Sequence, residues 1–233
     1  MNIIITGSSR GIGYETVKFL AMDLKNNIFA TARSSDGLEK LKMECAEIHK
    51  EATIYIYPFD LINGNYEELF KEITAKLDTV DVLVNLAGFL INKPFELMEE
   101  TDFKLRFDAN VKSVFKLIRG LVPYFSSNAH IVNIGSMGGT QGSAKFPGLS
   151  LYSASKGAVA ILTECLAEEL KDRNISVNCL ALGSAQTEML ENAFPGYKAP
   201  LSAAEMAAFI ADFAIRGHRW FNGKVLPVAV STP

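Results

Sequence analysis

Two patterns of apolar and polar residues alternate along this chain. Short runs of consecutive apolar residues are separated by longer stretches in which apolar residues recur every three or four positions. Continuous apolar runs are typical of strands buried on both faces, and the longer spacing is typical of amphipathic helices. We therefore expect strands at residues 2–6, 27–32, 53–58, 80–85, 129–134, 175–182 and 225–230.

Helical spacing fills the intervals between these strands. Ser202 and Glu205 have the spacing of a capping box, which marks the start of a last helix that ends near Gly217. The other predicted helices cover residues 14–21, 38–49, 66–77, 101–121 and 151–170. Strands that alternate with helices in this way form a parallel sheet with helices on both faces. The pattern predicts an α/β fold, a doubly wound parallel sheet of about seven strands, in a single domain over residues 1–233.

Length and composition agree with an ordinary globular domain. The 233 residues are 48% hydrophobic and 21% charged, with a formal net charge of −3 and no basic block, so we expect no nucleic acid partner. The three cysteines are far apart, without Cys-x-x-Cys or clustered histidines, and indicate neither a disulfide framework nor a metal site. We interpret His49, His130 and His218 as surface or strand-end residues. There is no leader-like segment and no apolar run of about 18 residues, so we expect a cytoplasmic protein without a membrane partner.

A glycine-rich turn joins the first predicted strand to the first predicted helix. It reads Gly7-Ser8-Ser9-Arg10-Gly11-Ile12-Gly13. Glycines in this position allow a tight turn, a close approach of the backbone to a phosphate, and packing of the helix on the sheet. The N–H groups of the following helix then face the pyrophosphate of a dinucleotide. We interpret the turn as a dinucleotide site; the alternative is a tight turn without a ligand.

The end of the second predicted strand bears on the choice of dinucleotide. An NAD site usually places an acid there, about twenty residues past the glycines, to bond the ribose hydroxyls. This chain has Thr31-Ala32-Arg33 and no carboxylate. Arg33, together with Arg10, has the charge to pair with a 2′-phosphate, which an acid would repel. We expect NADP(H) in preference to NAD(H); the alternative is that both arginines are only solvated side chains.

Tyr152 and Lys156 stand four residues apart at the start of the predicted helix 151–170. At this spacing the two side chains lie on one face of the helix, so the phenol and the ammonium meet. A free tyrosine titrates near pH ~10, and a nearby cation favours the phenolate. Such a tyrosine is suited to general acid or base catalysis near neutral pH. The alternative is a surface lysine that extends past a packed tyrosine, because Tyr-x-x-x-Lys occurs by chance in many helices.

Taken together, the motifs of this chain resemble the classical short-chain dehydrogenase/reductase family over nearly the full length. In order, they are Thr6-Gly7-x-x-x-Gly11-Ile12-Gly13, Asp60-Leu61, Asn85-x-Ala87-Gly88, Asn110, Ser136 and Tyr152-x-x-x-Lys156. Their order and separations are similar to those of the family. The resemblance implies a single-domain Rossmann fold, a homodimer or homotetramer, and hydride transfer between NADP(H) and a small carbonyl or alcohol substrate without a metal.

The resemblance also assigns roles to individual residues. It makes Tyr152 the proton donor to a carbonyl, or the acceptor from an alcohol, and Lys156 the cation that lowers its pKa and bonds the nicotinamide ribose. It makes Ser136 a hydrogen-bond donor to the carbonyl oxygen, and Asn110 the holder of a water that links Lys156 to solvent. The remaining cofactor contacts that it implies are Asp60 and Leu61 at the adenine, Asn85, Ala87 and Gly88 beside the ribose, and Gly183 and Thr187 at the nicotinamide amide.

Three functions are compatible with this resemblance. The leading hypothesis is an NADPH-dependent reductase of a ketone or aldehyde, with 3-oxoacyl thioesters as one plausible substrate group. A non-catalytic, NADP(H)-sensing regulatory relative is less favoured, because all four catalytic positions are filled. A nucleotide-sugar epimerase or dehydratase usually needs a longer C-terminal substrate region. Only residues 188–201 separate Thr187 from Ser202, which predicts a short substrate lid.

Overall fold

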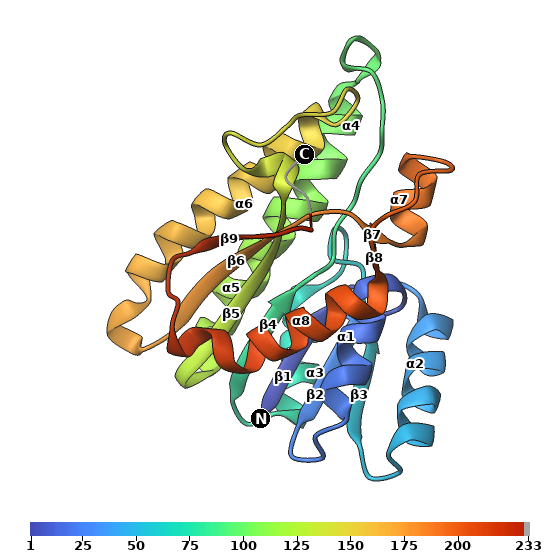
Figure 1. Ribbon diagram of the computed structural model, residues 1–233. Helices are drawn as coiled ribbons and strands as arrows, with labels where there is room; N and C mark the ends of the chain where they lie inside the picture. Colours follow the sequence, from blue (N-terminus) through green and yellow to red (C-terminus); the bar gives the residue numbers. More distant parts are fainter. Residues whose placement is uncertain (231–233) are drawn as a thin grey trace.

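The computed structural model describes residues 1–230, and its centre is a seven-stranded parallel sheet (Figure 1). Its strands are β1 (Asn2–Thr6), β2 (Asn27–Ala32), β3 (Thr53–Pro58), β4 (Val80–Asn85), β5 (Phe125–Ser136), β6 (Ser176–Leu182) and β9 (Val225–Val228). They lie in the order β3-β2-β1-β4-β5-β6-β9. The chain reverses its direction of winding between β1 and β4, which opens a crevice at the carboxyl ends of these two strands, where sheets of this kind bind ligands. The predicted fold class is confirmed.

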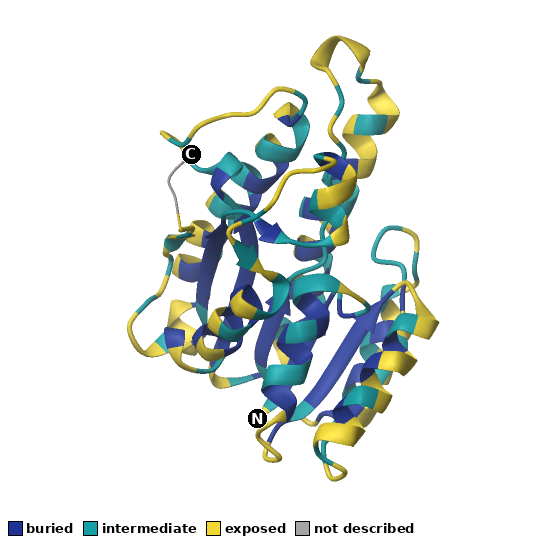
Figure 2. Ribbon diagram, turned by 45° about the vertical axis from the view of Figure 1, so that its right-hand side comes forward, coloured by how far each residue is buried: buried dark blue, intermediate teal, exposed yellow. Residues whose placement is uncertain are grey.

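Helices cover both faces of the sheet (Figure 1). They are α1 (Gly11–Ala21), α2 (Ser35–Ile48), α3 (Tyr66–Lys76), α4 (Glu100–Phe107), α5 (Ser113–Leu121), α6 (Ser150–Glu169), α7 (Glu188–Ala193) and α8 (Ala203–Arg216). Successive side chains of a strand point to opposite faces, so Ile3 and Ile5 pack with α1, α2 and α8, whereas Ile4 packs with α3, α5 and α6. Figure 2 shows the buried strands between helices with exposed outer faces. Both layers thus hold the carboxyl ends of the strands in fixed positions.

The helix expected at residues 101–121 is not a single regular helix. A π-helical stretch, Asp108–Lys112, separates α4 from α5 and contains the buried Asn110. A π-turn adds one residue to the helical turn and rotates the side chains on either side relative to one another. Such turns are rare and are found frequently at functional sites. The apolar spacing of the sequence does not reveal this turn.

β5 also begins earlier than expected, at Phe125 instead of residue 129. Ser126, Ser127 and Asn128 interrupt the apolar pattern and conceal the start of the strand. In the structure Phe125 pairs with Val80 of β4, and Ser126 Oγ donates a hydrogen bond of 2.6 Å to Asp81 Oδ1. At least Ser126 therefore belongs to the strand because its side chain finds a partner on β4.

The interpretation of His130 as a surface or strand-end residue is wrong. His130 lies inside β5 and is completely buried. Its Nδ1 lies 2.9 Å from the carbonyl oxygen of Ala214 in α8, and its Nε2 lies 3.0 Å from Asn178 Nδ2 on β6. A neutral imidazole that donates from Nδ1 and accepts at Nε2 satisfies both contacts. Burial lowers the pKa of His130 to about 4.

We predict that this histidine makes the fold less stable in mild acid. Because the pKa is about 4 in the folded protein and 6.5 ordinarily, the unfolded chain takes up a proton that the folded protein excludes. Stability is therefore retained above pH ~6.5, and the free energy of unfolding falls by up to ~1.4 kcal/mol per pH unit as the pH drops toward ~4. Urea unfolding between pH 7.5 and 4.5 measures this slope. His130→Gln should flatten it, and parallel slopes in both proteins would contradict the prediction.

Candidate active site

At Gly7 and Gly13 the glycine turn has room for backbone but not for a side chain. Gly7 has a φ of 77°, and a Cβ at this position would lie 2.8 Å from the Cα of Ala87. A Cβ at Gly13 would lie 2.3 Å from the carbonyl oxygen of Gly7. Thr6 Oγ1 accepts hydrogen bonds from the amides of Leu86 and Ala87, at 3.1 and 3.0 Å, and ties the end of β1 to the end of β4. A narrow cradle at the N-terminus of α1 fits the pyrophosphate of a dinucleotide.

The other residues of the turn are placed by their neighbours. Ser9 packs against Gly37 at the start of α2, where a Cβ on Gly37 would lie 2.8 Å from the Cβ of Ser9. Ile12 is partly buried against the core under α1. Gly11 faces Thr187, whose Cγ2 would lie 3.5 Å from a Cβ on Gly11. Gly11 and Thr187, which are 176 positions apart in the sequence, therefore border one cradle.

The two arginines expected at a 2′-phosphate are both exposed. Arg10 Nη1 donates to Glu188 Oε2 at 2.7 Å, and the two side chains are 58% and 67% exposed. Glu188 is the first residue of α7, and Thr187 caps this helix by accepting a hydrogen bond of 3.2 Å from the amide of Leu190. Arg33 lies at the end of β2 and points into solvent. The glycine turn is thus in direct contact with Glu188, the first residue of the segment 188–201 that the sequence predicts to be a lid.

Asp60 and Leu61 follow β3 and belong to a hydrogen-bonded turn. Burial alone would raise the pKa of Asp60, but hydrogen bonds from Ile62 and Asn63, with a smaller effect of Arg33, hold it below its ordinary value. Leu61 is partly buried in the second core layer. The side chain of Asp60 is therefore an ionised carboxylate that shapes its own loop.

Lys156 is the buried cation of the site. Its side chain is on the face of α6 that carries Tyr152, with Nζ 5.9 Å from the centre of the tyrosine ring. Nζ donates a hydrogen bond of 2.7 Å to the carbonyl oxygen of Ile134, near the carboxyl end of β5. The loss of solvation lowers the pKa of Lys156 to about 8. The predicted juxtaposition of phenol and ammonium is present.

Ser136 is the last residue of β5 and lies beside Tyr152. Burial raises the pKa of the Tyr152 phenol, and its interaction with the Ser136 hydroxyl acts in the opposite direction. Lys156 was expected to lower the pKa of Tyr152; its Nζ lies 5.9 Å from the ring centre, and it is not among the groups that shift this pKa here. Ser136 is therefore the group that favours the phenolate here.

Asn110 joins the π-turn to the loop after β4. Its Oδ1 accepts a hydrogen bond of 2.7 Å from the amide of Phe89, and its Nδ2 donates to the carbonyl of Phe89 at 3.0 Å. A Cβ on Gly88 would lie 3.4 Å from Lys156 Nζ and 3.5 Å from Asn110 Oδ1. The structure thus brings Gly88, Asn110 and Lys156 together around one small space.

Asn85 lies deeper than the cofactor contact that the resemblance implied. Its Nδ2 donates to Asn133 Oδ1 at 2.8 Å, and Asn133 Nδ2 donates to Thr163 Oγ1 on α6 at 2.9 Å. All three residues are buried. Sequence reasoning missed Asn133 and Thr163, and the available signal was an asparagine inside an otherwise apolar strand. Gly183 lies after β6, where its amide donates to the carbonyl of Val228 at 2.9 Å.

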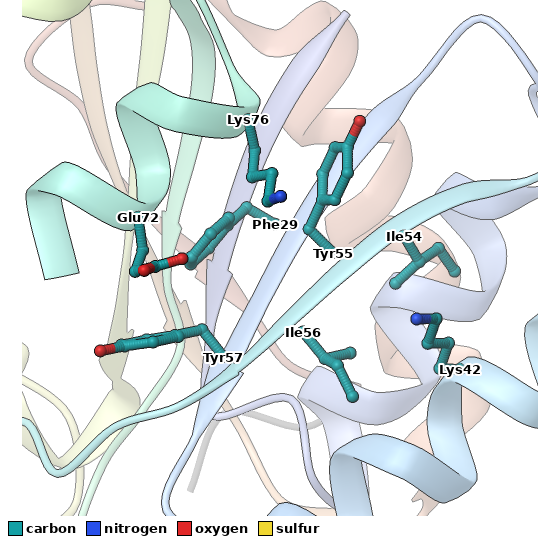
Figure 3. Close-up of a pocket in the computed structure, with 8 residues that line it drawn as sticks. All are labelled: Phe29, Lys42, Ile54, Tyr55, Ile56, Tyr57, Glu72 and Lys76. Atoms are coloured by element: carbon teal, nitrogen blue, oxygen red, sulfur yellow. The ribbon is translucent and has the colours of Figure 1, made fainter.

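A surface cavity of about 210 Å³ lies elsewhere, along the edge strand β3 (Figure 3). It is lined by Phe29, Lys42, Ile54, Tyr55, Ile56, Tyr57, Glu72 and Lys76. Lys76 lies over the ring of Tyr55, with Nζ 5.8 Å from its centre. None of these residues belongs to the catalytic or cofactor set, so this cavity is separate from the candidate site.

Two further observations concern residues 1–230. No group of three or more His, Cys, Asp or Glu side chains in this part of the chain is arranged to hold a metal ion. No helix in the same range combines the length and apolar character needed to cross a bilayer.

Comparisons with known proteins agree with this geometry. The family model described as short chain dehydrogenase matches residues 1–198. The 3-oxoacyl-[acyl-carrier-protein] reductase FabG of Thermotoga maritima is 32% identical over 206 residues, which cover 88% of this chain and 79% of that protein. A short chain dehydrogenase from Burkholderia cenocepacia in complex with NADP is 24% identical, with a TM-score of 0.88 over 99% of this chain and 96% of that one.

A second solved structure carries the other nicotinamide cofactor. The 7α-hydroxysteroid dehydrogenase complexed with NADH and 7-oxo glycochenodeoxycholic acid is 25% identical, with a TM-score of 0.88 over 99% of this chain and 93% of that one. Similar folds thus hold NADP in one protein and NADH in the other. The match to the family model covers most of the chain and coincides with the glycine turn and the Tyr152–Lys156 pair, so the chain belongs to the short-chain dehydrogenase/reductase family.

Proposed function

We propose that this protein is an NADP(H)-dependent reductase that converts a ketone or aldehyde into an alcohol, and the alcohol back in the reverse direction. The observation that carries the proposal is the convergence of Tyr152, Lys156, Ser136 and Asn110 beside the ends of β4 and β5. The interaction of Tyr152 with Ser136 and the burial of Lys156 support it. The glycine cradle at the start of α1 would hold the pyrophosphate of the cofactor.

The four side chains divide the chemistry between them. The cofactor supplies the hydride when it is bound. The Ser136 hydroxyl donates a hydrogen bond to the carbonyl oxygen as negative charge develops on it. Tyr152 gives its phenolic proton to that oxygen, which completes the C–OH bond. Because the Ser136 hydroxyl is then engaged by the substrate oxygen, the positive charge of Lys156, whose Nζ lies 5.9 Å from the centre of the tyrosine ring, stabilises the phenolate that remains. Asn110 holds the loop after β4. A water held at Asn110 would link Lys156 to solvent, from which the proton is replaced.

We extend the proposal to the surroundings of the site. The chain forms one domain with a short lid at residues 188–201, works in the cytoplasm and assembles as a homodimer or homotetramer. Exposed Phe103, Phe115 and Ile161 on α4, α5 and α6 supply an apolar surface for such an assembly. Because the Thermotoga maritima relative is named a 3-oxoacyl-[acyl-carrier-protein] reductase, 3-oxoacyl thioesters are the first substrate class to test.

Tyr152→Phe tests the proton donor. Without the phenolic proton, kcat/KM for NADPH oxidation should fall at least ~100-fold on every active carbonyl, while cofactor affinity stays within about twofold. A panel of 3-oxoacyl thioesters, ketones and aldehydes supplies the substrates. Tyr124→Phe, at an exposed tyrosine just before β5, is the matched control and should keep full activity. An unchanged rate in Tyr152→Phe refutes the assignment, and a wild type that binds NADPH but reduces nothing in the panel refutes the enzyme.

Arg10→Ala and Arg33→Ala test the cofactor preference. Each substitution removes a guanidinium that would form charge-assisted bonds with the 2′-phosphate, so NADPH should bind roughly tenfold more weakly and NADH about as before. Fluorescence titration with both cofactors at one fixed ionic strength measures this. Arg173→Ala, at an exposed arginine after α6, is the control for the loss of one surface charge. Equal losses for NADPH and NADH would contradict the pairing.

Glu188→Gln tests whether the lid competes for the same arginine. Glu188 Oε2 accepts from Arg10 Nη1 at 2.7 Å, so its carboxylate competes with a 2′-phosphate for this guanidinium. An exposed ion pair contributes up to ~1 kcal/mol, so its removal should strengthen NADPH binding by up to about fivefold and leave NADH binding unchanged. In the Arg10→Ala background the same substitution should have no effect. A gain that persists in that background would show that Glu188 acts on the phosphate directly.

A further inference from the structure

Ser155 is a buried hydroxyl next to Lys156, and it takes no part in the proton and hydride transfers proposed above. It precedes Lys156 in α6 and has no exposed surface. Its Oγ accepts a hydrogen bond of 2.9 Å from Asn110 Nδ2 and donates one of 2.7 Å to the carbonyl oxygen of Tyr152. Both partners belong to the candidate active site, so the hydroxyl connects two catalytic positions that lie on different helices.

These bonds complete a chain that crosses three segments. The amide and carbonyl of Phe89, after β4, hold the side chain of Asn110 in the π-turn. Asn110 holds Ser155, and Ser155 holds the backbone of Tyr152. Lys156 is fixed separately, by its bond of 2.7 Å to Ile134 on β5. The turn of α6 that carries the catalytic pair is thus anchored on one side to the sheet and on the other to the π-turn.

The first turn of α6 has no side-chain cap at its N-terminus. The helix begins at Ser150, and its N-cap residue Leu149 provides no side-chain hydrogen bond to the free amides of the first turn. Uncapped first turns fray because these amides have no partner within the helix. Tyr152 lies in this first turn, two residues after the helix begins. Ser155 is the side chain that ties the carbonyl of Tyr152 to a buried group outside the helix.

We propose that Ser155 is a positioning residue that sets the place of the Tyr152 phenol by joining its helical turn to Asn110. This inference rests on the proposed function, in which Tyr152 transfers the proton. Proton transfer depends on the distance and direction between donor and acceptor, so a freer first turn of α6 lowers the rate of the chemical step. Binding of cofactor and carbonyl relies on other contacts and is unaffected.

Ser155→Ala tests the proposal, because alanine suits a helix and leaves its backbone bonds intact. The loss of this buried hydrogen bond should lower kcat roughly five- to tenfold, with the KM of the carbonyl and the Kd of NADPH within about twofold of wild type. Thr74→Ala is the matched control. Thr74 is partly buried in α3, away from the candidate site, and its hydroxyl bonds only to the carbonyls of Phe70 and Lys71 in its own helix, so kcat should change less than twofold.

Amide hydrogen exchange gives a readout that does not depend on turnover. In Ser155→Ala, amides at residues 150–156 and 88–91 should exchange faster together, whereas Thr74→Ala should leave both segments unchanged. An unchanged kcat in Ser155→Ala, or equal losses in the two variants, overturns the proposal. Tyr152→Phe distinguishes a failure of the proposed function from a failure of the positioning role of Ser155. If Tyr152→Phe stops turnover and Ser155→Ala does not slow it, the enzyme stands and the positioning role fails; if Tyr152→Phe stays active, the proposed function fails first.

Discussion

The hydrogen bond from Lys156 to the carbonyl of Ile134 is the contact on which the candidate active site depends. It places an ammonium between the catalytic helix and the centre of the sheet, where water is excluded. A buried cation is costly unless polar groups surround it, and here the loss of solvation brings its pKa down to about 8. The space around it is kept small by glycines. A Cβ on Gly139 would lie 2.7 Å from the carbonyl carbon of Lys156, and one on Gly88 would lie 3.4 Å from Nζ.

The core between β4, β5 and α6 also contains polar side chains. Asn85, Asn133 and Thr163 form a buried line of hydrogen bonds that links β4 and β5 to α6. The two bonds fix the Asn133 side chain between Asn85 and Thr163, whereas Asn85 Oδ1 is buried without a hydrogen-bond partner among residues 1–230. The apolar layers on the two faces of the sheet do not fix side-chain positions in this way. Apolar contacts do not select one register over another with the precision of a hydrogen bond. The polar line sets where α6 crosses the sheet.

The sequence predicted the architecture because the strands are buried on both faces, which produces apolar runs that are easy to recognise. It also predicted the Tyr152–Lys156 pair, since four residues in a helix fix the geometry locally. The π-turn at Asn110 escaped prediction, because one extra residue hardly changes the apolar spacing on either side. The contact between Arg10 and Glu188 joins residues 178 positions apart, and only the folded sheet brings them together. The burial of His130 was missed for a related reason, since its partners Ala214 and Asn178 come from distant elements.

The contacts of α7 connect the glycine turn with the loops that precede α4 and α6. α7 begins at Glu188, directly over the glycine turn, and ends at Ala193, whose carbonyl accepts a hydrogen bond of 3.1 Å from Asn92 in the loop before α4. Asn92 in turn packs against Gly148 in the loop before α6, and the amide of Lys93 donates to the carbonyl of Gly148 at 3.1 Å. These contacts link the glycine turn, through α7 and Asn92, to the loop that precedes Tyr152. Glu188 is thus held at the glycine turn, and Ala193 is held through Asn92 at the loop that precedes α6, so α7 is attached at both of its ends.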